Sequence, residues 1–98
     1  MTTADLRRLQ SAVAEGRYDL TQHAVEELAD DDLDILDLEA AVAAAILLRV
    51  QTDDARGARY TVAGPSVDGN RRVGVVGRFT DEGRFVVITV FQALKRED

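Results

Sequence analysis

The chain has 98 residues, of which 46% are hydrophobic, and this composition is typical of a single globular domain with one modest core. Because the chain has no cysteine and only one histidine, we expect no disulfide and no zinc site. The chain has neither a P-loop nor a dinucleotide-binding glycine motif, and we expect no metal and no cofactor. The net charge of −6 argues against a general nucleic-acid-binding protein, and the lack of a visible signal peptide or long apolar stretch predicts a cytoplasmic protein without membrane contact.

The charge is unevenly distributed along the chain. Residues 1–55 have a net charge of −9, whereas residues 56–98 have a net charge of +3. Such an asymmetry can direct an anionic ligand toward the basic half of the molecule. The alternative is an acidic solvated surface with arginines scattered over the strands, because runs of charge usually face solvent.

Two helices are predicted at the start of the chain. The first covers about residues 4–15, where apolar residues repeat at helical spacing, and Gly16 is a natural stop. Thr21 is a good N-cap for a short second helix. The aspartates at 30–32 are expected to end that helix, because aspartate side chains compete with the helix for backbone hydrogen bonds.

A third helix has the strongest periodic pattern in the chain, and Asp34 or Asp37 is expected to cap it. We expect it to pack across the sheet as the central core helix. The alternative use of its apolar face is a subunit interface, for example in a homodimer. The residues that recur at the spacing of one helical face are Leu38, Ala41, Val42, Ala45 and Ile46.

The second half of the chain has the alternating pattern of β-strands. The last strand is apolar on both faces, which predicts a position in the middle of a sheet. Gly64-Pro65 is expected to end the strand that covers residues 59–63. The order α-α-α-β-β-β-β predicts an α+β fold, with the helices on one face of a 3–4 stranded antiparallel sheet and the other face open to a ligand. The expected strands cover residues 47–52, 59–63, 72–79 and 85–91.

Two residues with possible chemical roles are His23 and Thr89. His23 lies near the start of the second helix, where a neutral imidazole is suited to accept a proton from a ribose 2′-hydroxyl. The alternative is a surface or capping histidine with no chemical role. Thr89 is the one hydroxyl in the apolar last strand, and it is either a site residue or simply a good strand former.

A group of arginines lies on or beside the strands. A guanidinium is suited to bind phosphate, because its planar fork donates two parallel, charge-assisted hydrogen bonds. The alternative is a set of exposed strand residues that pair with the acidic helices. The arginines are Arg59, Arg71, Arg72, Arg78 and Arg84.

Several of these segments together resemble the DUF4258 family. Leu20-Thr21-Gln22-His23-Ala24 opens the second helix, and Arg59-Tyr60-Thr61-Val62-Ala63-Gly64 forms a strand that ends in glycine. Arg72-Val73-Gly74-Val75-Val76 follows a turn, and Val87-Ile88-Thr89-Val90-Phe91 forms the last strand. The resemblance covers about residues 17–92 of the single domain 1–98 and leaves the first helix mostly outside.

That family is grouped with small bacterial toxins of the RelE-like and BrnT-like ribonuclease fold. The resemblance therefore implies the toxin of a toxin–antitoxin pair. Such a toxin is an endoribonuclease of the mRNA interferase type, which cleaves RNA without a metal and binds a small cognate antitoxin. The resemblance makes His23 the acid–base candidate and Thr89 a hydroxyl that orients the site. Arg59 and Arg72 are our own choice for the phosphate contacts, since neither falls on a family motif.

The chain departs from the family pattern near the presumed site. Glu27 stands where the family usually has arginine, and Asp31 stands near another common arginine. Gly74 replaces a frequent histidine, and Phe91 replaces the usual tyrosine. Acidic residues repel the RNA backbone, and a lost arginine no longer stabilises transition-state charge. The pattern is therefore also compatible with a retained fold that has lost catalysis.

Two functions fit these residues. One is the RNA-cleaving toxin, and the other is a catalytically inactive protein-binding or oligomerisation module on the same fold, whose acidic edge faces a basic partner. An enzyme that acts on a small anionic metabolite is a third class, but no motif in the chain names its substrate.

Overall fold

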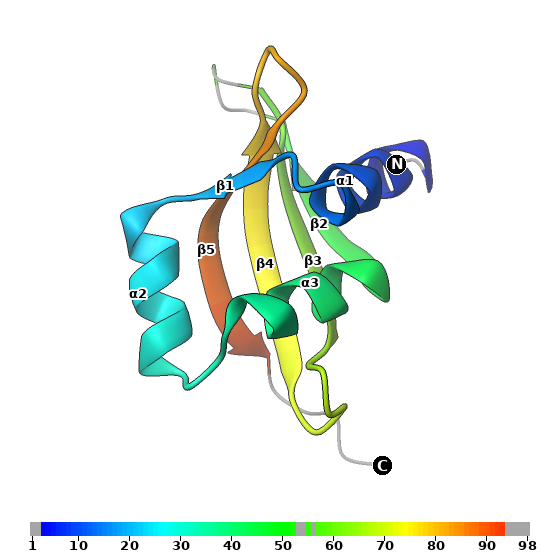
Figure 1. Ribbon diagram of the computed structural model, residues 1–98. Coiled ribbons are helices and arrows are strands. Elements are labelled where there is room, and N and C mark those ends of the chain that lie inside the picture. Colours follow the sequence, from blue (N-terminus) through cyan, green and yellow to red (C-terminus); the bar gives the residue numbers. More distant parts are fainter. Residues whose placement is uncertain (1–2, 53–54, 56, 94–98) are drawn as a thin grey trace.

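The computed structural model describes residues 3–52, 55 and 57–93, which form two layers, a layer of helices on one face of a β-sheet (Figure 1). Among these residues no helix is long and apolar enough to cross a membrane. In chain order the elements are α1 (Thr3–Ala14), β1 (Tyr18–Leu20), α2 (Gln22–Asp30), α3 (Ile35–Ala43), β2 (Ile46–Gln51), β3 (Arg59–Pro65), β4 (Arg72–Phe79) and β5 (Phe85–Ala93).

The sheet is mixed and has five strands in the order β1-β5-β4-β3-β2. Strands β2 to β5 form an antiparallel meander, whereas β1 runs parallel to β5, with Tyr18 opposite Phe85. The α+β class is confirmed, but the expected 3–4 stranded antiparallel sheet and the order α-α-α-β-β-β-β are wrong. With three residues, β1 is too short to show the alternation that marks a strand, and its partner is distant in the sequence.

The helix ends follow from local chemistry that the sequence already contains. Gly16 lies just beyond α1 with φ of +76°, a conformation that glycine adopts without strain. Thr21 is the N-cap of α2, and its hydroxyl accepts a hydrogen bond from the backbone N–H of Ala24 at 3.1 Å. Asp34 and Asp37 form a capping box at the start of α3, so both expected capping residues act there.

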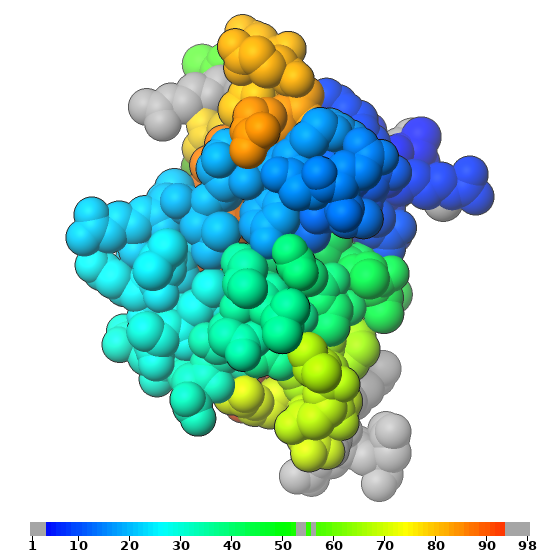
Figure 2. Space-filling model, in the orientation of Figure 1, coloured from blue at the N-terminus to red at the C-terminus, as the bar shows by residue number. Residues whose placement is uncertain are grey.

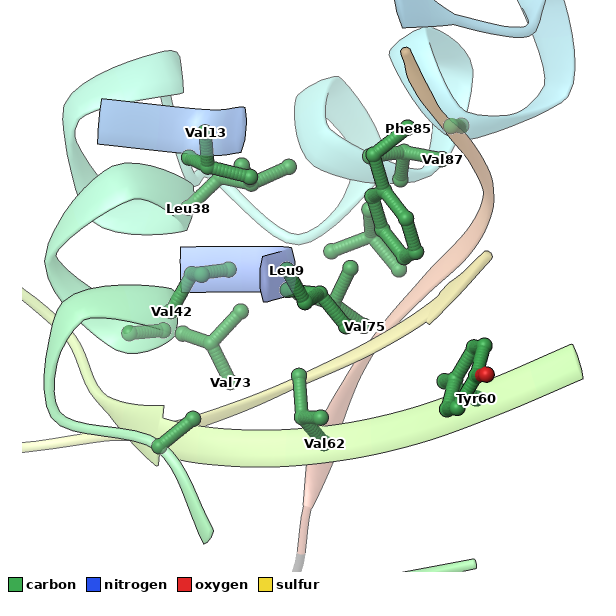
Figure 3. Close-up of a cluster of buried hydrophobic side chains, with 14 of the residues drawn as sticks. Leu9, Val13, Leu38, Val42, Tyr60, Val62, Val73, Val75, Phe85 and Val87 are labelled. Atoms are coloured by element: carbon green, nitrogen blue, oxygen red, sulfur yellow. The ribbon is translucent and has the colours of Figure 1, made fainter. Parts of the chain in front are cut away.

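The core lies between the helical layer and the sheet. Helix α3 packs against β3 and β4 and is the central core helix, as expected. Its backbone lies so close to β3 that a Cβ atom on Gly64 would be 2.0 Å from the carbonyl oxygen of Ala41. Figure 3 shows the buried side chains that meet there, among them Leu9, Val13, Leu38, Val42, Val62, Val73, Val75, Phe85 and Val87.

Strand β5 lies in the interior of the sheet only at its start. Its first three residues pair with β1, and beyond Val87 the helix α2 lies beside that edge (Figure 1). The expected central position is therefore correct for part of the strand. Strand β3 continues through Gly64 and Pro65 instead of ending before them, since a proline is tolerated where the ladder of hydrogen bonds ends.

Candidate functional site

The face of the sheet that points away from the helices carries every basic residue of strands β2–β5. Val62 and Val75 pair with each other and point into the core, so the residues one step along each strand point to the other side. These four strands contain four arginines and no carboxylate. We call this surface the open face, and its arginines are Arg49, Arg59, Arg72 and Arg78.

The helices cover one face of the sheet, and the open face lies on the opposite side of the molecule. In Figure 2 the segments of α1, α2 and α3 hide almost all of the sheet when it is viewed from the helical side. The arginines that point the other way are half-buried or exposed, and so are Thr61 and Thr89, which pair with Val76 between them. Within the described residues, the open face is therefore a basic surface with hydroxyl groups near its centre.

The arginines named from the sequence fall into two groups, those on the open face and those with structural partners. Arg59 and Arg72, the predicted phosphate contacts, lie on the open face with Arg78. Arg71 instead donates hydrogen bonds to the carbonyl oxygens of Asp31 at 2.8 Å and Asp32 at 3.0 Å, just beyond the end of α2.

Arg84 also has a structural partner, because its Nε donates to Asp19 Oδ2 at 2.8 Å. The Arg84 guanidinium holds the pKa of the Asp19 carboxyl below its usual value through this hydrogen bond, which outweighs the effect of desolvation. Arg84 thus pairs with a carboxylate of β1, and Arg71 binds backbone carbonyls that follow α2, so neither forms the expected ion pair with a helix.

His23 lies on α2, the helix that packs beside the edge of β5 that no strand covers. Its side chain is 64% exposed, and its Nε2 lies 3.2 Å from Oε2 of Glu27, one turn farther along the helix. The other carboxylate oxygen of Glu27 accepts a hydrogen bond from the backbone N–H of Val90 at 2.8 Å. The polar partner of His23 is thus Glu27, and the predicted residues Arg59, Arg72 and Thr89 lie on the sheet itself.

Two contacts of Thr21 hold the start of α2 against β5. Its backbone N–H donates to the carbonyl of Val87 at 3.0 Å, and its hydroxyl donates to the carbonyl of Ile88 at 3.2 Å. Ile88 is the extra residue of a β-bulge, because Gly77 and Val76 of β4 pair with Val87 and Thr89. The cap of α2 therefore places His23 near the segment of β5 that carries Thr89.

A cavity of about 530 Å³ opens beside this junction. It lies at the end of the open face, between the start of α2, the adjoining ends of β4 and β5, and the turn that joins those two strands. The described part of the chain contains no group of three or more histidine, aspartate or glutamate residues arranged to hold a metal ion. The lining residues are Thr21, Arg78, Phe79, Thr80, Asp81, Glu82, Val86 and Ile88.

The family comparison covers the same residues that build this surface. The profile of DUF4258, described as a domain of unknown function, matches residues 20–92. The chain belongs to the DUF4258 family. The match begins just before the cap of α2 and ends in β5, so α1 lies outside the family region. No curated protein and no solved structure matches the chain.

The two acidic departures from the DUF4258 pattern have structural contacts. Glu27 supplies an acceptor to a backbone N–H at the sheet edge, where β5 has no neighbouring strand to accept it. Asp31 is the C-cap residue of α2, and its carbonyl oxygen accepts a hydrogen bond from the guanidinium of Arg71. Both residues therefore attach α2 to the sheet side of the molecule, and Glu27 also places a carboxylate beside His23.

The other two departures, Gly74 and Phe91, lie opposite each other on the open face. A Cβ atom on Gly74 would be 2.2 Å from Cζ of Phe91 and 2.5 Å from both Cε atoms. The outer end of the phenyl ring therefore covers Gly74. Any larger side chain at position 74, such as histidine, would require the ring of Phe91 to move.

The sequence contained a signal for only part of this site. Arg78 follows Arg72 at an even spacing, which places both on one face of a regular strand. Arg49 had no such signal, because an irregularity in β2 between Leu47 and Arg49 shifts the alternation. Nothing in the sequence predicted the contact between Glu27 and Val90, which depends on α2 lying beside an edge that no strand covers.

Proposed function

We propose that this chain is the RNA-cleaving toxin of a bacterial toxin–antitoxin pair, with a RelE-like arrangement in which RNA lies on the open face. The observation that carries the proposal is the charge of strands β2–β5, which hold four arginines and no carboxylate, with the only histidine of the chain on the helix beside β5. Arginines on one surface attract a phosphate backbone and bind its oxygens with paired hydrogen bonds. The overall net charge of −6 does not oppose this, because the carboxylates lie on other elements.

In this proposal His23 acts as the general base. It removes the proton of a ribose 2′-hydroxyl, the 2′-oxygen attacks the adjacent phosphorus, and the bond to the 5′-oxygen breaks. The leaving 5′-oxygen takes a proton from water, which gives a 2′,3′-cyclic phosphate and a 5′-hydroxyl, and the hydroxide formed takes the proton back from the imidazolium of His23. Arg59 and Arg72 lie at opposite ends of the paired strands β3 and β4, so they bind phosphates at separate points along the RNA, and Thr89 orients the site. The nucleophile belongs to the substrate, so this route uses no metal ion.

The same surface is the proposed contact of the cognate antitoxin. A small protein that covers the open face would bury the arginines and block RNA, and it would need acidic groups to match their charge. RNA as the substrate and a neighbouring antitoxin as the partner also favour the cytoplasm as the place of action.

The decisive experiment compares growth after controlled induction of the wild type, His23→Ala and Gln22→Ala, with total RNA examined from each culture. Gln22 is the matched control, because it is an exposed neighbour on the same helix. We expect growth arrest and RNA breakdown with the wild type and Gln22→Ala, and neither with His23→Ala. Normal growth of the wild-type culture, with the protein present in the soluble fraction, would rule out the toxin.

A non-catalytic binding module on the same fold is the second candidate. The observation that favours it is the carboxylate of Glu27, which takes the place of a family arginine, lies beside His23 and repels RNA phosphate. On this alternative the protein forms a dimer or a complex and cleaves nothing. Because the toxin also binds a partner, incubation of the purified protein with RNA separates the two candidates, and sedimentation with capture of partners then tests the module. A monomer that captures no partner would count against the module.

A further inference from the structure

The proposed binding of phosphate by the arginines of the open face does not account for the cavity beside the cap of α2. It adjoins the open face at the end where β4 turns into β5, and it shares Arg78 with that face. Its volume of about 530 Å³ lies within the range of roughly 300–1,000 Å³ that is usual for small-molecule sites. An RNA strand bound along the arginines would therefore have room to place one nucleotide in it.

The lining of the cavity combines three kinds of group. Val86, Ile88 and Phe79 form an apolar wall, against which a flat ring can pack. Arg78 is the positively charged member among the described lining residues. Asp81 and Glu82, on the exposed turn, add carboxylates that accept hydrogen bonds and donate none when ionised.

These groups restrict the chemistry of a ligand. An apolar wall with one guanidinium suits a planar body that carries an anionic group, such as a nucleoside phosphate. The carboxylates favour a ring edge that presents N–H donors and disfavour one that presents carbonyl oxygens. Guanine offers a ring N–H and an amino group side by side, so both can donate to a single carboxylate. Uracil offers one N–H between two carbonyl oxygens and fits least well.

We propose that this cavity is a base-recognition subsite of the open face that takes one nucleotide of the RNA and prefers guanine over uracil. Asp81 and Glu82 read the base edge, Val86 and Ile88 pack against the ring, and Arg78 binds the phosphate. The inference rests on the proposed function, because it treats RNA as the ligand of the open face. It adds a sequence preference that neither the family nor the arginines supply.

The test is titration of the full chain, uniformly ¹⁵N-labelled, with the four nucleoside 3′-monophosphates, followed by NMR of the backbone amides. The expected result is chemical-shift change at Thr80, Glu82 and Ile88, with guanosine monophosphate binding about tenfold more tightly than uridine monophosphate. An Asp81→Asn/Glu82→Gln variant is expected to bring the two affinities to within about twofold, because an amide donates where the carboxylate only accepted.

The matched control is Glu26→Gln/Asp30→Asn, which makes the same change in charge at two exposed positions of α2 outside the cavity. This variant is expected to keep the guanine preference. Equal affinity for all four nucleotides in the wild type would overturn the base preference. Chemical-shift changes confined to residues outside the cavity would overturn the site itself. Loss of the guanine preference in the control variant would mean that the preference comes from net charge.

RNA cleavage is measured separately on two oligonucleotides that differ only in having guanosine or uridine at the positions whose base could enter the cavity. Cleavage without nucleotide binding in the cavity would sink the subsite and leave the ribonuclease intact. Guanine-selective binding without cleavage would keep the subsite and end the ribonuclease proposal.

Discussion

Helices α2 and α3 and the open face of the sheet have opposite electrostatic character. Residues 18–48, which include α2 and α3, contain nine carboxylates and neither lysine nor arginine. Strands β2–β5 contain four arginines and no carboxylate, and all four arginines point away from the helices. The net charge of a chain therefore says little about one particular surface, when the fold places carboxylates and arginines on different elements.

The two sides also differ in how tightly they are packed. On the helical side, the backbone of α3 lies directly against Gly64 of β3. On the open side, the close neighbour of Gly74 is the end of a phenylalanine side chain. A backbone in a packed core has little room to move, whereas an aromatic ring at a half-exposed surface can rotate aside.

The largest expected effect compares the two glycines directly. Gly64→Ala would place a methyl group 2.0 Å from the carbonyl oxygen of Ala41, and we expect it to lower the free energy of unfolding by about 3 kcal/mol. For Gly74→Ala the three nearest atoms all belong to the ring of Phe91, so we expect a loss of about 1 kcal/mol or less. Urea unfolding of both variants measures this. Equal losses would mean that the two faces are packed alike.

The next effect concerns RNA affinity. Removing one phosphate contact lowers the salt dependence of binding, so Arg72→Gln is expected to reduce the slope of log affinity against log salt by about 0.7 for single-stranded RNA. The matched control is Arg7→Gln, an exposed arginine of α1 on the other side of the molecule, which is expected to leave the slope unchanged. The measurement is fluorescence anisotropy with a labelled oligonucleotide at several salt concentrations. An equal change in both variants would remove the distinction between the faces.

A smaller effect is expected at the junction between the two sides. Thr21→Ala removes the cap of α2 and the hydrogen bond to Ile88, and we expect it to cost about 1 kcal/mol of stability. Ser11→Ala, which removes an exposed hydroxyl from α1, is the control and should change stability by less than about 0.5 kcal/mol. If Thr21→Ala behaves like the control, the cap does not hold α2 against β5.

The smallest effect is a pH dependence on the acidic side. Backbone N–H groups of Val67 and Asp34 donate to the carboxylate of Asp37 and hold its pKa below its ordinary value of 3.8. A carboxyl whose pKa is lower in the folded state stabilises the fold above 3.8. That stability is lost as the pH falls from there through the lower, folded-state value.

The measurement is urea unfolding of the wild type and Asp37→Asn from neutral pH down to about pH 2, a range that spans the titration of the carboxyl. The variant should be less stable at neutral pH, and the difference should narrow as the pH falls. A constant difference would mean that the charge of Asp37 is not involved.

Local chemistry determined most of the elements from the sequence alone. Gly16, Thr21 and the Asp34–Asp37 pair mark helix ends by interactions within a few residues, and such signals need no tertiary contact. In β3, Tyr60 and Val62 lie in the core and Arg59 on the other face, as the period of two of a strand requires. The family resemblance likewise rests on short segments, and the DUF4258 profile confirms it.

Long-range geometry decided what the sequence could not. The pairing of Tyr18–Leu20 with β5 made the sheet mixed and five-stranded, because a three-residue strand forms only where a partner is already in place. The partner of Glu27 and the gathering of Arg49 with the other arginines depend on strand register. Residues distant in the chain meet only through packing, so their contacts produce no periodic pattern in the sequence.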